Sequence, residues 1–216
     1  SMGLRRKAQK YLEMLISDRL DKLEIIYEGQ ALSKEELIEI KSLIAKKIFQ
    51  AEREKEKKNQ LLERILSYGK IFQSLESKEK LLSFLFGELS SYFGVEKAIF
   101  FEVFDGTSKI TKVIGLEGNC VAKTIEWSLQ QQQCLNKGTS ECFENEITFR
   151  DIAPDIESYL LVPVKMKNNL LGGMVIFRVK DEKIKCFSSE ESEKIFEWIA
   201  TLLAPSLYMF SQDLAQ

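Results

Sequence analysis

The chain has 216 residues, of which 44% are apolar and 30% charged, enough apolar material for the core of a globular domain with an extension. A net charge of −2 gives no basic surface for nucleic acid, and no apolar run is long enough to cross a bilayer. The absence of histidine excludes histidine metal ligands, Ser-His-Asp and Cys-His pairs, and a phosphorylated kinase histidine.

Four cysteines, Cys120, Cys134, Cys142 and Cys186, show no C-x-x-C spacing. The pattern is typical of reduced, mostly buried thiols in a cytoplasmic protein, with a redox pair or a structural disulfide as the alternative. We therefore expect no metal site and no bound cofactor. Ser1-Met2 resembles a cloning remnant, and the chain is expected to be a piece of a longer protein.

Lys, Glu and Leu dominate up to about residue 95 and predict helices. A first helix is expected over residues 4–28, with Gly29 ending it. Ser33 and Glu36 form a capping box at the start of a second helix. Residues 1–75 are thus predicted to form a helical hairpin with coiled-coil character.

The second helix carries apolar residues at alternating spacings of three and four from Leu37 to Leu75. The charged run 52–58 interrupts this stripe. Such a run is typical of a solvated helix face, and a loosened, signal-transmitting segment of a coiled coil is the alternative. A third helix is expected over 78–92, before Gly94.

After Gly94 the apolar period shortens to that of strands. Strands are predicted at 98–104, which ends at Asp105-Gly106, and at 110–114. A helix is expected over 119–135.

The last third predicts two short strands, a hairpin and a helix. The short strands are expected at 141–143 and 147–149, and the hairpin strands at 158–167 and 170–179, joined by a turn at Asn168-Asn169. A helix from Ser189 to Phe210 follows, with a capping box of Ser188 and Glu191 and a kink at Pro205.

This order of elements resembles that of GAF domains, although PAS domains share the architecture. Three local motifs carry the resemblance over residues 75–211. The first is Phe149-Arg-Asp151 before Ser158-Tyr-Leu-Leu-Val-Pro-Val164, the second is Leu171-Gly-Gly-Met-Val-Ile176, and the third is Phe187-Ser-Ser-Glu-Glu191.

The resemblance implies an α+β fold with a six-stranded antiparallel sheet and flanking helices, preceded by the long helical hairpin. It places the GAF domain at residues 76–211 and a tail at 212–216. It also implies a ligand cavity on the sheet face opposite the terminal helices. The residues expected there are Phe101, Cys120, Trp127 and Asp151.

The cyclic-nucleotide signature of the family is only partly present. Lys180, Phe187 and Glu191 match it, whereas Val179 and Ser192 replace its asparagine and glutamate. Arginine, which grips phosphate with two donors, is nearly absent between residues 65 and 177. An apolar or zwitterionic metabolite is therefore favoured over a nucleotide.

The first and last helices of such domains often build a dimeric bundle. In this chain, the apolar residues on the matching helix faces, here called the seam, predict a homodimer. The alternative is that the two N-terminal helices bury these residues against each other within one chain. The interface residues are Leu61, Ile65, Tyr68, Phe72, Leu75, Ile195, Trp198 and Leu202.

The leading functional interpretation is a cytoplasmic, non-enzymatic regulatory module of a signalling protein. It would sense a small molecule, or simply dimerise, and pass a helix rearrangement to an output domain outside this chain. The alternative is a ligand-free scaffold for dimerisation or for partner proteins. A cysteine-dependent reductase related to the enzyme that repairs free methionine sulfoxide comes third, because Cys120 lies near the position of a catalytic thiol in that enzyme.

Overall fold

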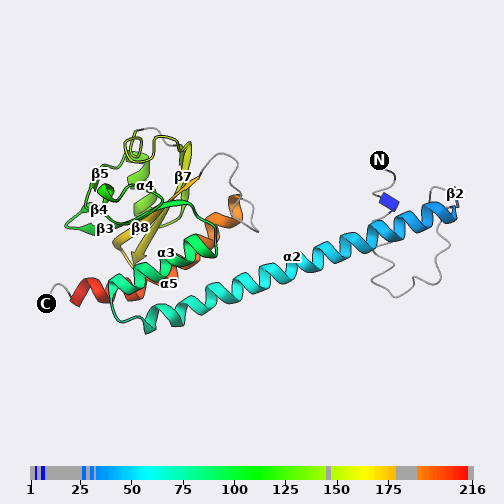
Figure 1. The fold of residues 1–216 in the computed structure, drawn as a ribbon, viewed down its shortest axis with the longest axis horizontal. Helices are drawn as coiled ribbons and strands as arrows, with labels where there is room; N and C mark the ends of the chain where they lie inside the picture. Colours follow the sequence, from blue (N-terminus) through cyan, green and yellow to red (C-terminus); the bar gives the residue numbers. More distant parts are fainter. Residues whose placement is uncertain are drawn as a thin grey trace. The chain divides into compact units, whose positions relative to one another are not determined.

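The computed structural model describes residues 3, 6–7, 26–27, 30–31, 33–144, 147–178 and 189–213 (Figure 1). The chain divides into two compact units, residues 1–60 and 61–216. Within the described ranges, none of the helices combines the length and the apolar content that crossing a membrane requires.

The first unit contains a small strand pair and the start of a long helix. Strands β1 (Ile26–Tyr27) and β2 (Gln30–Ala31) pair antiparallel. The predicted first helix, residues 4–28, is therefore wrong at its end, because Ile and Tyr suit a strand better than a helix. The structure describes only residues 6–7 and 26–27 of that range, and 6–7 are helical.

The long helix α2 (Lys34–Ser74) is confirmed. The backbone N–H of Glu36 donates to Ser33 Oγ over 3.2 Å, as a capping residue requires. Ile40 and Ile44 are buried, whereas every residue from 45 to 60 except Ile48 is exposed. This exposed stretch has no Gly or Pro and brings opposite charges three or four positions apart, which supports a helix in water.

The second unit is built on a six-stranded sheet in which all neighbouring strands pair antiparallel, as predicted. The strand order is β5-β4-β3-β8-β7-β6. The strands are β3 (Lys97–Phe104), β4 (Thr107–Ile114), β5 (Thr124–Ile125), β6 (Glu141–Glu144), β7 (Ser158–Met166) and β8 (Asn169–Arg178).

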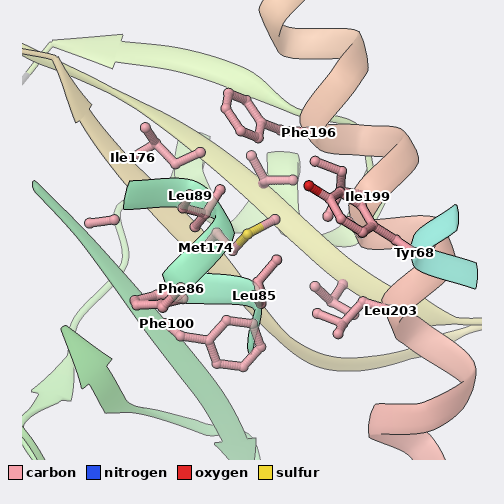
Figure 2. Packing of buried hydrophobic residues seen from close by; sticks show 14 of the residues in the cluster. Tyr68, Leu85, Phe86, Leu89, Phe100, Met174, Ile176, Phe196, Ile199 and Leu203 are labelled. Carbon is pink, nitrogen blue, oxygen red and sulfur yellow. The ribbon is translucent and has the colours of Figure 1, made fainter. Parts of the chain in front are cut away.

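Apolar side chains on both faces of the sheet require cover from both sides. Helices α3 (Lys78–Ser91) and α5 (Ser189–Asp213), with the end of α2, pack on one face, here called the proximal face. Helix α4 (Leu129–Lys137) lies on the other, the distal face (Figure 1). Figure 2 shows the proximal core, in which Tyr68 of α2 lies beside Ile199 of α5.

Three local predictions were wrong. The helix expected over 119–135 is a 3-10 turn (Gly118–Cys120), strand β5 and then α4, because Ser128 and Gln131 form a capping box that starts α4 later. Residues 147–149 form a turn anchored by buried Phe149 instead of a strand.

The hairpin turn is also displaced by one residue. Met166 pairs with Asn169, so the two turn residues are Lys167 and Asn168, with φ of 56° at Lys167. A register irregularity between Val164 and Lys165 accompanies this shift, and an alternation pattern does not reveal it.

A polar clamp fixes the end of α2 to α3. Arg64 binds both carboxylate oxygens of Glu88, at 3.0 Å (Nη2–Oε1) and 3.1 Å (Nε–Oε2), and Tyr68 donates its hydroxyl to the same carboxylate over 3.1 Å. The Arg64 guanidinium also lies 3.9 Å from the ring centroid of Tyr92. The two-donor geometry fixes this end of α2 against α3.

Two glycines in β8 allow β3 to approach closely. A Cβ on Gly172 would lie 2.2 Å from the carbonyl oxygen of Phe101, so Gly172→Ala must shift backbone. We expect a loss of about 2 kcal/mol or more in the free energy of unfolding. Urea unfolding followed by tryptophan fluorescence measures it, since both tryptophans lie in the second unit.

Gly87→Ala is the matched control, because Gly87 lies in α3 with open space around its Cβ position. It should stabilise the protein by about 0.5–1 kcal/mol through helix propensity. Equal unfolding midpoints for the two variants would contradict the assigned strand packing.

Candidate functional site

The distal face of the sheet is occupied by six aromatic side chains in mutual contact. This distal aromatic cluster consists of Phe101, Trp127, Phe143, Phe149, Tyr159 and Phe177. Phe149 lies at its centre, with ring centroids 5.8 Å from Trp127, 5.0 Å from Tyr159 and 5.4 Å from Phe177. The ring centroids of Phe101 and Trp127 lie 5.0 Å apart. Most ring pairs in the cluster meet edge to face, as is common in protein cores.

The polar edges of the cluster are hydrogen-bonded. Trp127 donates its indole N–H to Ser108 Oγ over 2.8 Å. Gln131 of α4 is buried, and its amide contacts both the Tyr159 hydroxyl and Thr148 Oγ1. Buried polar groups with partners fix the rings in place. The cluster therefore fills the face on which the sequence predicted a ligand cavity.

The predicted ligand residues separate into two groups. Phe101, Cys120 and Trp127 belong to the distal core, Phe101 and Cys120 buried and Trp127 half-buried. Asp151 is exposed and lines a cleft that Cys120 also reaches.

This β4-end cleft, of about 400 Å³, lies where β4 ends. Its lining residues are Lys97, Gly115, Leu116, Glu117, Asn119, Cys120, Lys123, Asp151, Ile152, Pro154 and Asp155. Of the predicted ligand residues, Cys120 and Asp151 line this cleft. The other lining residues were not predicted, because they come from loops whose shape depends on the positive φ angles of Gly115 and Ala122. Gly115 was the one available signal in the sequence.

Of the three remnants of the nucleotide signature, only Glu191 lies in the described part of the chain. Lys180 and Phe187, like the capping residue Ser188, lie outside the described residues. Glu191 is half-buried in the first turn of α5.

Most of the predicted dimer seam lies inside the proximal core. Leu61, Ile65, Tyr68, Phe72 and Ile195 are at most 4% exposed, and they pack with α3 and the sheet. The seam also includes the half-buried Leu75 and Leu202 and the exposed Trp198.

Sequence reasoning missed the neighbouring outer stripe. Leu62, Leu66 and Met209 are exposed by 40%, 70% and 63%. Leu62 and Leu66 directly follow Leu61 and Ile65 of the predicted interface. This adjacency is the signal by which the sequence could have indicated the outer stripe.

Comparison with known proteins gives structural matches only: the chain matches no protein-family model and no curated protein. The GAF domain from a phosphoenolpyruvate-protein phosphotransferase of Coxiella burnetii aligns with a TM-score of 0.59 at 17% identity, over 72% of this chain and 97% of that one. The corresponding domain from Acinetobacter gives 0.58 at 15% identity, over 71% and 96%.

A third match is the GAF domain of a two-component sensor histidine kinase from Bacillus halodurans. It aligns with a TM-score of 0.54 at 18% identity, over 66% of this chain and the whole of that one. At these identities the likeness concerns the fold. The sheet order, the helices on its two faces and these alignments show that the chain has the GAF fold.

Proposed function

We propose that the chain is a regulatory module of a signalling protein that works by self-association of α2 and α5. The observation that carries this proposal is an exposed apolar stripe shared by the two helices. It consists of the exposed Leu62 and Leu66 on α2 and the exposed Trp198 and Met209 on α5, with the half-buried Leu202 between them.

The stripe is continuous across both helices. Leu62, Leu66 and Gly69 lie on one face of α2 because they are spaced by four and three residues. A Cβ on Gly69 would lie 3.5 Å from Leu202 Cδ2, so α2 and α5 meet at this point. A second copy of the chain is the occupant we propose, because side chains of both helices contribute to one apolar surface.

The attachment of the helices explains how association reaches the domain. Helix α5 packs on β7 and β8, and the Arg64–Glu88 clamp ties α2 to α3. A rearrangement of the paired helices is thereby carried along α2 and α5 to an output domain outside this chain. The resembling domains from a sensor histidine kinase and from phosphotransferases support such an arrangement.

A ligand-free dimerisation scaffold is the second candidate, and the distal aromatic cluster favours it. An open apolar cavity on the sheet would favour sensing at that face. Here six rings pack against one another over the middle of that face, which favours the scaffold.

Self-association is tested by sedimentation as a function of concentration. We expect the mass to rise from 24.9 kDa toward twice that value. Leu66→Asp should keep the protein at the mass of one chain, because a carboxylate in an apolar interface loses its hydration. Ile147→Asp is the matched control, since Ile147 is 82% exposed and lies away from the stripe. A wild-type chain that stays monomeric at high micromolar concentration would refute the proposal.

Thiol chemistry is disfavoured at two of the cysteines. Burial, with the nearby Glu141 carboxylate, raises the pKa of Cys134 to about 12. Desolvation against α5 and a 3.0 Å hydrogen bond to Glu193 raise the pKa of Cys142 to about 11. A catalytic thiol needs the opposite shift, because only the thiolate is nucleophilic. We therefore propose that neither Cys134 nor Cys142 acts as a nucleophile.

Alkylation by iodoacetamide, measured for each cysteine by mass spectrometry, checks this assignment. A raised pKa leaves little thiolate at pH 7.5, so the rate at Cys142 should be low there and rise steadily as the pH approaches 11. Glu193→Gln removes a carboxylate partner and should accelerate alkylation of Cys142 at pH 8, with Glu144→Gln as control. A rate at Cys142 that is already maximal at pH 7.5 would contradict the assignment.

A further inference from the structure

The walls of the β4-end cleft are fixed by the backbone. Gly115 has a φ of 67°, and a Cβ there would lie 2.0 Å from the carbonyl oxygen of Glu96. Beyond it, the N–H of Ala122 bonds to the carbonyl of Ile110 over 2.7 Å, and that of Lys123 to Cys120 over 3.2 Å. Only glycine fits at position 115 without strain.

The opposite wall is a turn tied to the distal core. Ala153 N–H bonds to the Phe149 carbonyl over 2.9 Å, and Ile156 N–H bonds to the Ala153 carbonyl over 3.3 Å. Ala153 and Ile156 are both buried. Backbone hydrogen bonds therefore hold both walls, which lowers the cost of ordering the site on binding.

The cleft presents charges of both signs around an apolar floor. Leu116, Cys120 and Ile152 belong to the distal core and supply the floor. The charged side chains are Lys97, Lys123, Glu117, Asp151 and Asp155. Within the described ranges, no ion pair joins these lysines to these carboxylates. Their charges remain available to a bound molecule.

We propose that the β4-end cleft binds a small zwitterion with an aliphatic body. Its carboxylate would pair with Lys97 and Lys123, its ammonium with Asp151 and Asp155, and its aliphatic part would cover the floor. As the signal of a regulatory module this ligand rests on the proposed function, whereas its binding rests on the cleft alone.

Another ligand, phosphate, and another cavity both fit less well. No arginine lines the cleft, so a phosphate would lack a donor pair that grips it, and three carboxylates would repel it. A second cavity, of about 360 Å³ between α4 and β6, has Glu141 and Glu144 in its lining and no cationic side chain. It offers no cation to the carboxylate of a zwitterion.

Three matched probes test the assignment by amide NMR of the whole chain. L-norleucine carries both charges, hexanoate lacks its ammonium group, and pentylamine lacks its carboxylate. Norleucine should shift the amides of residues 115–123 and 151–155 saturably, with a Kd of about 1 mM or tighter. Hexanoate and pentylamine should each bind at least about tenfold more weakly than norleucine.

Charge variants then separate the two contacts. Lys123→Gln should weaken the binding of norleucine and hexanoate and leave that of pentylamine unchanged. Asp151→Asn should weaken the binding of norleucine and pentylamine and leave that of hexanoate unchanged. Lys109→Gln, on an exposed part of β4 outside the cleft, should change nothing.

The proposal is overturned by equal affinities for the three probes, by shifts located elsewhere, or by no shifts at all. These outcomes concern binding, so they are distinct from the mass measurements that test self-association.

Discussion

The sheet of the second unit is apolar on both faces, and this constraint governs the rest of the domain. In β3, Ala98 and Phe100 face the helices, whereas Ile99 and Phe101 face the opposite side. Leu160 and Leu161 divide in the same way in β7. A sheet of this kind is stable in water only when both faces are covered. The chain covers one with α2, α3 and α5, and the other with α4, the 149–156 turn and aromatic rings.

Cover on the proximal face determines how the helices can act. Residues such as Ile65 and Tyr68 cannot serve a partner chain and the core at once, because they are almost fully buried in the core. The self-association that we propose therefore uses the outer side of the same helices. In the proposed mechanism, the residues nearest the core transmit a change in helix position to the sheet, and those on the outside receive it.

Cover on the distal face determines where a small molecule can bind. The aromatic rings occupy the space over the middle of the sheet, and their polar edges are bound to Ser108 and Gln131. A cavity persists at the end of β4, where Gly115 bends the chain away from the sheet. The proposed ligand site is thus a consequence of loop geometry at one edge.

Sequence patterns predicted the parts of the fold that depend on local periodicity. The long helix, α3 and the strand hairpins followed from apolar spacing and capping residues such as Ser33, whereas the six-stranded antiparallel sheet was implied by the resemblance to GAF domains. The break of the 119–135 segment was missed because its apolar positions fit a helix, while the capping box at Ser128 and the pairing of β5 with β4 decide the outcome. Which residues face a partner and which face the core depends on packing between distant segments, and no local pattern specifies it.

The central claim is that the distal aromatic cluster is a core and not a ligand cavity. The free energy of unfolding of Phe149→Ala tests it most directly, because Phe149 is 1% exposed and contacts three rings. A core ring should cost about 3–5 kcal/mol when it is removed, whereas Phe104→Ala, at a ring that is 43% exposed, should cost much less. A loss below about 1 kcal/mol for Phe149→Ala, as expected for a side chain that lines an open cavity, would contradict the account.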